Sequence, residues 1–186
     1  MSQSDHSTAP LTIIGTGMAG LGLARAVRSH DAERPITLIS ADSGDDYAKP
    51  LLSSAFTKRQ TAEALAIRDA VGVAESLQAR VRIHTRVDAI DTANRQLRIG
   101  TEILPYGQLV LATGAAPRQP FDVSPALHDR VFQINNLDDY RRLRGLLDRH
   151  PGHQARIAII GAGLVGCEFA SDLHAGGHRV ALISPE

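Results

Sequence analysis

LTIIGTGMAG at residues 11–20 and IAIIGAGLVG at residues 157–166 are two versions of one pattern. Each has a continuous apolar run followed by G-x-G-x-x-G, which is typical of a buried parallel strand that turns into a helix. Each copy then leads into a second apolar run, ITLIS at 36–40 and VALIS at 180–184. One such motif is weak evidence, because a glycine-rich turn can also be purely structural. Two copies in matching surroundings predict a chain that binds two dinucleotides and moves electrons between them.

The three glycines of such a motif have separate physical roles. The first allows a tight turn, the second lets the backbone approach a pyrophosphate, and the third lets helix and strand pack closely. The helix N-terminus adds free N–H groups and a partial positive charge for the phosphates. The glycines with these roles are Gly15, Gly17 and Gly20 in the first copy and Gly161, Gly163 and Gly166 in the second.

The composition is that of a globular protein of 186 residues, 43% hydrophobic and 22% charged, with zero net charge. This neutrality gives no electrostatic support for nucleic-acid or membrane-surface binding. The single cysteine, Cys167, excludes an internal disulfide, and we expect it to be a small packing residue. No apolar run approaches the roughly 20 residues of a membrane span. Residues 1–10 lack a signal-peptide pattern, so we expect a flexible N-terminus and a cytoplasmic location.

The remaining pattern predicts an α/β fold with a small antiparallel β insertion. Residues 81–100 alternate between apolar and polar positions, which predicts short antiparallel strands. Residues 61–78 are expected to be helical, with an interruption near Gly72, and residues 41–49 to form a loop. Buried strands are expected at 11–16, 36–40 and 106–112, and amphipathic helices at 19–30 and 137–149.

The position that usually carries a ribose-binding acid holds a serine in both copies. Such an acid ends the second strand of a dinucleotide fold, where this chain has Ser40 and Ser184. Ser40 can still donate to and accept from a ribose hydroxyl, whereas Asp42 fits both a ribose contact and a loop role. Glu186 would repel a 2′-phosphate and so favours NADH over NADPH, although Arg179 keeps NADPH open.

Four segments occur in the order typical of the FAD-dependent pyridine nucleotide oxidoreductases. They are the first glycine motif, YAKPLLS at 47–53, LVLATGAAPR at 109–118 and GAGLVGCEFA at 161–170. Over residues 11–186 the chain resembles that superfamily, and most of all its bacterial rubredoxin–NAD(+) reductase branch. The resemblance implies a Rossmann-like FAD-binding domain at 11–118, a linker at 119–136 and the start of a Rossmann-like NAD(H)-binding domain at 137–186. It also implies the N-terminal part of a longer protein, which by itself would bind FAD poorly and be inactive.

The resemblance also implies which residues contact the cofactors. For the FAD they are Gly15, Thr16, Gly17, Met18, Ala19 and Gly20 at the pyrophosphate, Ser40 and Ala41 at the adenosine ribose, Val87 at the adenine, Lys49 and Pro50 along the flavin, and Ala112, Thr113 and Gly114 close by. For the NAD(H) they are Gly161, Gly163, Leu164, Gly166 and Glu168. Without the resemblance, Lys49 is a surface lysine, Val87 a strand residue and Glu168 a first-turn glutamate that the helix dipole favours.

The implied function is transfer of electrons from NADH through FAD to rubredoxin, which in some members feeds alkane hydroxylation. Because the chain has no internal dithiol, direct transfer from the flavin to a one-electron iron protein is the better interpretation. The alternatives are a ferredoxin-type or flavorubredoxin reductase, or a non-enzymatic redox sensor. No residue is assigned as an acid–base or nucleophilic catalyst.

Two further features point more weakly to a partner or a metal. The arginines of residues 137–149 could receive an acidic partner, but we favour a solvated helix face balanced by its aspartates. Histidines form two close pairs, at 150 and 153 and at 174 and 178. Gly176 and Gly177 interrupt the second pair, so we expect no metal site.

Overall fold

The computed structural model describes residues 9–119, 121–149 and 154–184. The chain divides into two compact units: unit 1 contains residues 1–47 and 67–115, and unit 2 contains residues 48–66 and 116–186. Several expectations fall outside the described residues: a flexible N-terminus over residues 1–8, the histidine pair at 150 and 153, and the role of Glu186.

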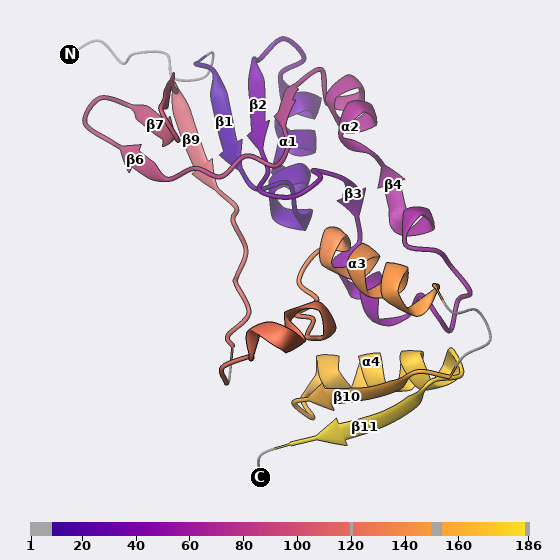
Figure 1. Cartoon of the computed structure of the whole chain (residues 1–186). Helices are drawn as coiled ribbons and strands as arrows, with labels where there is room; N and C mark the ends of the chain where they lie inside the picture. Colours follow the sequence, from indigo (N-terminus) through magenta and orange to yellow (C-terminus); the bar gives the residue numbers. More distant parts are fainter. Residues whose placement is uncertain (1–8, 120, 150–153, 185–186) are drawn as a thin grey trace. The chain divides into compact units, whose positions relative to one another are not determined.

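Unit 1 is built on a four-stranded parallel sheet with the strand order β5-β2-β1-β9 (Figure 1). Ile14 at the end of β1 pairs with Ile39 of β2 and with Leu111 of β9, so three strands end at one level. The elements before the insertion are β1 (Leu11–Ile14), α1 (Met18–His30), β2 (Ile36–Ile39), β3 (Asp46–Tyr47), β4 (Ala66–Arg68), α2 (Ala70–Leu77) and β5 (Arg80–Arg82), and β9 (Gln108–Leu111) follows it.

The core of unit 1 lies between this sheet and the two helices α1 and α2. Its centre is formed by Ile13 and Leu38, both 0% exposed, with Leu21 and Ala24 of α1 and Val73 of α2 packed against the strands. The apolar runs of β1 and β2 therefore became buried strands because helices cover them. Residues 106–112 were also expected to form a buried strand, but β9 is only half-buried at the edge of the sheet, and its Leu111 is 60% exposed. The first strand is shorter than the expected 11–16, since Gly15 has a φ of +112° and turns the chain.

Two expectations for residues 61–100 were wrong. Only part of 61–78 is α-helical, because η2 (Glu63–Leu65) and β4 precede α2, and Gly72 lies inside α2 without interrupting it. Its N–H donates 2.8 Å to the Asp69 side chain, which caps α2. Val81 belongs to β5, which pairs in parallel with β2, so the antiparallel insertion begins later than expected.

The antiparallel insertion itself is a three-stranded sheet of β6 (Ala89–Asp91), β7 (Gln96–Ile99) and β8 (Glu102–Pro105). Leu97 of β7 is fully buried, as the alternating pattern predicted for the inward positions. Arg82 at the end of β5 donates to both carboxylate oxygens of Glu102, at 2.8 and 2.6 Å, and so links the insertion to the parallel sheet.

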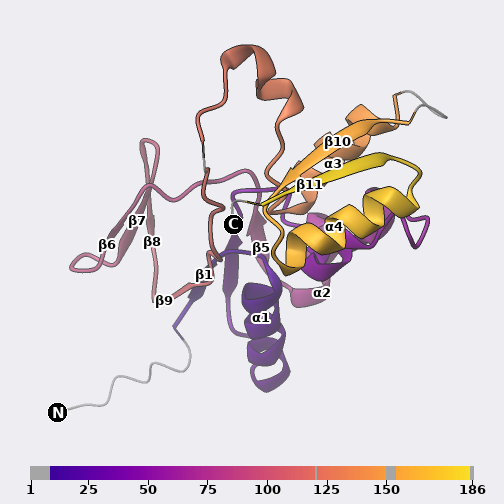
Figure 2. The ribbon, with the colours of Figure 1, turned by 90° about the horizontal axis from the view of Figure 1, so that it is seen from below.

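Unit 2 contains a parallel pair of strands, covered on one face by α4 (Figures 1 and 2). Helix α3 of this unit begins with a capping box, in which Asn136 accepts from Asp139 N–H and the Asp139 side chain accepts from Asn136 N–H. Tyr140 and Leu143 of α3 are buried. The elements are η1 (Lys49–Ser53), η2, η3 (Pro125–Arg130), α3 (Leu137–Leu147), β10 (Arg156–Ile160), α4 (Leu164–Ala175) and β11 (Arg179–Ile183).

Candidate dinucleotide sites

The first glycine motif forms a tight turn between β1 and α1. Gly15 takes a φ of +112°, and a Cβ there would lie 2.1 Å from the Ala112 carbonyl oxygen of the neighbouring strand end. A Cβ on Gly20 would lie 1.9 Å from the Gly15 carbonyl oxygen, so only glycine fits without a shift. Around Gly17, in contrast, the described residues leave the space open to 4 Å. The turn is therefore closed on its protein side and open where a phosphate would approach.

The second glycine motif repeats this geometry between β10 and α4. Gly161 has a φ of +110°, and a Cβ on Gly166 would lie 1.9 Å from the Gly161 carbonyl oxygen. Gly163 again faces open space among the described residues, and Leu164 beside it is 87% exposed. Gly17 and Gly163, the N-cap residues of the two helices, have nearly identical backbone angles, with φ −70° and ψ −177° against φ −72° and ψ 176°.

Both turns present helix N-termini that no described side chain caps. The first N–H groups of α1 and α4 therefore remain available to an anion. In the first turn, Met18 and Ala19 are exposed beside Gly17, while Thr16 is buried. The open space at the second glycine, the tight packing of the third and the uncapped N-terminus together fit a dinucleotide pyrophosphate in both turns.

The edge of the parallel sheet brings the other predicted FAD residues of unit 1 together. Because β1, β2 and β9 are parallel and end at one level, the glycine turn, the Ser40–Ala41 corner and the Thr113–Gly114 corner follow three adjacent strand ends. Thr113 and Gly114 are exposed, and Gly114 has a φ of +67°. Ligands of parallel α/β sheets bind at this edge.

Val87 is half-buried in the connection between β5 and β6, not in a strand as its sequence context indicated. Thr85 N–H donates 2.7 Å to the Ser40 carbonyl, and His84 N–H donates 2.9 Å to the Asp42 carbonyl. These bonds bring the connection alongside the residues that follow β2, which is the neighbourhood expected for Val87.

Ser40 differs from expectation in how its hydroxyl is used. The side chain is 3% exposed, accepts 2.7 Å from the Thr16 hydroxyl and donates to the Asp42 carboxylate. The same carboxylate accepts 3.0 Å from Gly44 N–H, so Asp42 stabilises its own turn. A side-chain contact of Ser40 with a ribose would compete with this network, whereas the exposed Ala41 beside it leaves the backbone accessible.

Lys49 and Pro50 lie in unit 2, at the start of η1. Both are exposed, and Lys49 Nζ donates 2.7 Å to the Asn135 side-chain oxygen. Pro50 stands in the first turn of η1, where its missing N–H costs nothing. The side chain of Lys49 is therefore held in place but remains open to solvent.

Glu168 and Asp172 of α4 both bind the segment that follows Lys49 and Pro50. Glu168 accepts 2.7 Å from the Ser53 hydroxyl, and the 2%-exposed Asp172 accepts from the N–H groups of Phe56 and Thr57. Sequence reasoning considered Glu168 but missed Asp172. The available signal was an acid one helical turn after Glu168, next to the apolar Leu173.

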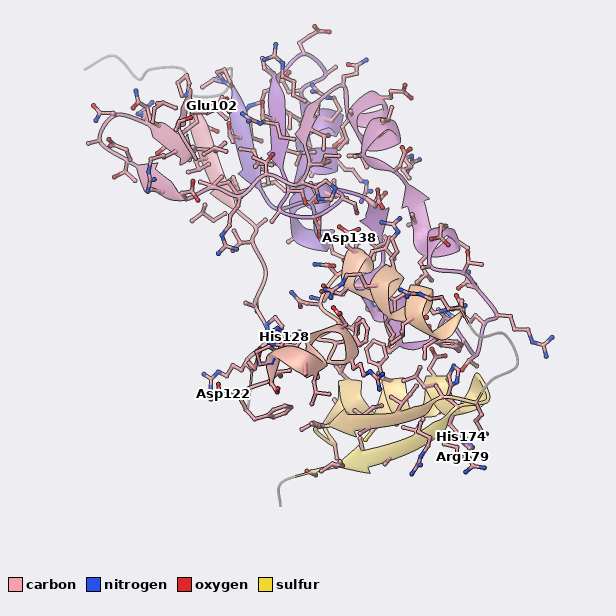
Figure 3. All side chains as sticks on the ribbon, in the orientation of Figure 1. Glu102, Asp122, His128, Asp138, His174 and Arg179 are labelled. Carbon is pink, nitrogen blue, oxygen red and sulfur yellow. The ribbon has the colours of Figure 1, made fainter. Side chains whose placement is uncertain are left out.

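Two side chains differ from their predicted environments. Cys167 is exposed and donates 3.4 Å to the Ala162 carbonyl, so it is not the packing residue we expected. Arg144, counted as part of a solvated arginine face, points into unit 2. It donates 2.9 Å to the Gln60 carbonyl and lies 4.1 Å from the centre of the Phe56 ring. Arg141 does behave as a balanced surface residue, since it pairs at 3.0 Å with Asp138. Asp138 lies in the first turn of α3 and is labelled in Figure 3.

No group of three metal-ligating side chains occurs among the described residues. The two histidines at the end of α4 have different environments: His174 is exposed, at the helix end labelled in Figure 3, whereas His178 is 8% exposed. Likewise, none of the helices in the described ranges is long and apolar enough to cross a membrane.

Comparison with known proteins gives consistent relatives. The chain is 39% identical over 176 residues to a rubredoxin-NAD(+) reductase of Alcanivorax borkumensis, covering 95% of this chain and 45% of that protein. It is 37% identical over 179 residues to a nitric oxide reductase FlRd-NAD(+) reductase of Vibrio vulnificus, with coverages of 95% and 45%. The putidaredoxin reductase of a covalent complex with putidaredoxin superposes with a TM-score of 0.77 at 28% identity, covering 94% of this chain and 42% of that one.

The chain spans less than half the length of the curated relatives it matches. These similarities confirm the expected α/β fold class and the expected resemblance to rubredoxin-NAD(+) reductases, and FAD and NAD(H) are the cofactors used in this family. The family model described as pyridine nucleotide-disulphide oxidoreductase matches residues 9–186. With both glycine turns intact in the structure, the chain belongs to the pyridine nucleotide-disulphide oxidoreductase family.

Proposed function

We propose that the protein to which this chain belongs transfers electrons from NADH through FAD to rubredoxin. The observation that carries the proposal is the doubled turn, with matching φ angles of +112° and +110° at Gly15 and Gly161 and a third glycine pressed on the first in both copies. Two such turns in one chain fit two dinucleotides. The names of the relatives, rubredoxin-NAD(+) reductase among them, support the choice of acceptor.

In this proposal each turn holds one pyrophosphate. The first turn, with Gly15, Thr16, Gly17, Met18, Ala19 and Gly20, would bind FAD through backbone N–H groups, assisted by Ala41, Thr113 and Gly114 at the same sheet edge. The second turn, with Gly161, Gly163, Leu164 and Gly166, would bind NADH. Bound together, these cofactors supply hydride transfer from nicotinamide to flavin. The task of the protein is to hold the two rings in register and to exclude water.

Lys49 and Pro50 would lie along the flavin, and Glu168 would face the nicotinamide side. Lys49 fits this role because it is exposed, and Asn135 steadies its ammonium group at 2.7 Å. A positive charge there would stabilise negative charge on a reduced ring. Of the two roles expected at the adenosine ribose, the structure supports Ala41 better, because the Ser40 hydroxyl is already bonded on both sides.

The domain limits stay as the sequence proposed them, with FAD binding at residues 11–118 and NAD(H) binding from residue 137. Residues 48–66, which include Lys49 and Pro50, belong to unit 2 of the structure. Within this chain, the lone Cys167 donates to a backbone carbonyl and has no second thiol to pair with. We therefore favour direct transfer from the flavin to an iron protein over a dithiol relay.

A second candidate acceptor is flavorubredoxin, the partner class suggested by the nitric oxide reductase FlRd-NAD(+) reductases, which match at 36–38% identity. A role in alkane hydroxylation is a finer proposal within the rubredoxin alternative. A redox sensor would bind the same nucleotides without sustained turnover.

The test is stopped-flow mixing of the full-length, FAD-loaded protein with NADH, followed by purified rubredoxin, flavorubredoxin or ferredoxin in separate experiments. We expect NADH to bleach the flavin absorbance and rubredoxin to restore it fastest. Faster reoxidation by flavorubredoxin or ferredoxin would reassign the acceptor. Bound FAD with no sustained turnover with any acceptor, including ferricyanide, would favour a sensor.

A further inference from the structure

The segment of residues 53–57 runs along one face of α4 and is held there at three successive turns. Glu168 accepts from the Ser53 hydroxyl at 2.7 Å, and Asp172 accepts from the backbone of Phe56 and Thr57. Gly176, one turn further along, borders the Phe56 ring. Residues four apart lie on the same helix face. We refer to these contacts of Glu168, Asp172 and Gly176 with residues 53–57 as the α4 clamp.

Asp172 is the central contact of the α4 clamp. Its carboxylate is 2% exposed, and each oxygen accepts one backbone N–H, from Thr57 at 2.8 Å and from Phe56 at 3.1 Å. A buried carboxylate is costly unless hydrogen bonds satisfy it, and bonds from N–H groups to a charged acceptor are about twice as strong as neutral ones. Asp172 therefore fixes both the position and the orientation of this stretch of backbone.

Gly176 completes the α4 clamp by allowing close packing. A Cβ at this position would lie 2.6 Å from Cδ1 of Phe56, although the φ of −71° would accept any residue. The Phe56 ring is also in contact with Arg144, at 4.1 Å, and meets the His178 ring edge-on at 5.4 Å. The requirement for glycine here is thus one of space, set by an aromatic ring that cannot move freely.

The two ends of this arrangement carry the proposed cofactor contacts. The N-terminus of α4 is the second glycine turn, and the clamped segment continues directly from η1, which begins with Lys49 and Pro50. We propose that Asp172 is a positioning residue, which holds the Lys49–Pro50 segment in a fixed place relative to the NADH-binding turn. This inference rests on the proposed function of those two sites.

The proposed role predicts a particular kinetic pattern. Removing the Asp172 carboxylate leaves the second glycine turn intact, so NADH should bind nearly as well as in the wild type. The Lys49–Pro50 segment, in contrast, should lose its fixed position. Misplacement by about 1 Å costs roughly 100-fold in rate, and we expect Asp172→Asn to slow flavin reduction at saturating NADH by roughly 10- to 100-fold, with less than about a 3-fold change in NADH dissociation constant. In Asp172→Asn, the amide NH₂ would face one of the two backbone N–H donors, so that hydrogen bond would be lost.

The experiment compares the full-length, FAD-loaded wild type with Asp172→Asn and with Asp129→Asn, an exposed aspartate of the same unit that controls for the lost charge. Stopped-flow reduction over a range of NADH concentrations separates the limiting rate from the dissociation constant. Hydrogen exchange of peptides covering residues 53–60, measured without NADH, reports on the anchor itself. Of these three proteins, we expect only Asp172→Asn to show faster exchange in these peptides.

A second pair of variants tests the α4 clamp without altering its charge. Gly176→Ala should loosen the segment in the same way, and adding Phe56→Ala should restore slow exchange and part of the reduction rate, because it removes Cδ1 and Cγ, the ring atoms that a Cβ at 176 would meet at 2.6 and 2.9 Å. If Asp172→Asn does not fold, this pair of variants tests whether the α4 clamp positions the Lys49–Pro50 segment. An unchanged limiting rate in Asp172→Asn, or an equal loss in NADH affinity, would overturn the positioning role. If NADH fails to reduce the flavin of the wild-type protein, the proposed function itself is overturned.

Discussion

The hydroxyl of Thr16 donates a 2.7 Å hydrogen bond to the hydroxyl of Ser40, and both side chains are buried, at 5% and 3% exposure. Thr16 belongs to the first glycine turn and Ser40 follows β2, so the bond joins two adjacent strand ends. The Ser40 hydroxyl in turn donates to the Asp42 carboxylate, which also accepts from Gly44 N–H. The corner expected to bind a ribose is therefore stabilised by hydrogen bonds among its own residues.

Ser40→Ala should destabilise the fold, because Thr16 and Asp42 would each lose a buried partner. Leaving such groups unsatisfied costs about 1–3 kcal/mol. The free energy of unfolding from urea denaturation measures this cost. Ser29→Ala, an exposed serine of α1, is the control and should change stability by less than about 0.5 kcal/mol. Equal stability of the two variants would show that the Ser40 network contributes nothing.

Gly17 and Gly20 should separate binding from folding. Gly20→Ala places a Cβ 1.9 Å from a backbone carbonyl and should cost about 1–3 kcal/mol or more of stability. Gly17→Ala meets open space and should cost at most about 1 kcal/mol, yet it should weaken FAD binding, because the new methyl group occupies the approach to the pyrophosphate. Flavin retained by the full-length, FAD-loaded protein after gel filtration and a thermal melt measure the two effects, and Gly22→Ala in the middle of α1 serves as the control. Full flavin retention in Gly17→Ala would contradict the proposed binding turn.

Arg82 should control the acidity of Glu102 on the antiparallel insertion. Its hydrogen bonds, and secondarily its charge, lower the pKa of Glu102 below the ordinary glutamate value. The pair thus favours folding at pH values above that ordinary pKa, and the contribution is lost as pH falls through the lowered one. In Arg82→Met the carboxyl pKa should return to its usual range, as followed by NMR titration. An unchanged Glu102 pKa in that variant would rule out the bidentate pair in solution.

His178 should make the stability of unit 2 sensitive to mild acid. Burial lowers its pKa, and the nearby Arg144 guanidinium lowers it further, while Asp148 opposes the shift. The unfolded chain then takes up the proton first, so stability is full above the ordinary histidine pKa and declines as pH falls towards the lowered folded value. Denaturant titrations at several pH values should show this decline in wild type and in His174→Gln, the exposed neighbour, but a smaller decline in His178→Gln. Parallel curves for all three proteins would remove His178 as the cause.

The sequence by itself determined the two glycine turns and the strands that precede them. An apolar run followed by G-x-G-x-x-G has few physical solutions, because the first glycine needs a positive φ and the third has no room for a Cβ; both requirements recur at Gly15, Gly20, Gly161 and Gly166. The antiparallel insertion was also predictable for β6 and β7, because apolar and polar residues alternate there in the sequence. The predicted range ended at residue 100, so it did not include β8.

Local patterns failed where a segment depends on distant partners. Residues 61–69 contain good helix formers, but β4 and Asp69, which caps α2, end any longer helix. Val81 alternates like its successors, yet β5 pairs with β2 because the parallel sheet offers an open edge there. Such pairing is a tertiary choice that propensity does not record.

Only the tertiary structure decided how the predicted site residues are used. Ser40 has a hydroxyl that could bind a ribose, but the fold brings Thr16 and Asp42 beside it. The hydroxyl accepts a hydrogen bond from Thr16 and donates one to Asp42. Asp172 belongs to no sequence motif. The two backbone N–H groups that donate to it, those of Phe56 and Thr57, lie more than a hundred residues earlier in the chain. Glycine requirements are local and can be read from sequence, whereas the partner of a buried polar group is set by which strands and helices the fold makes neighbours.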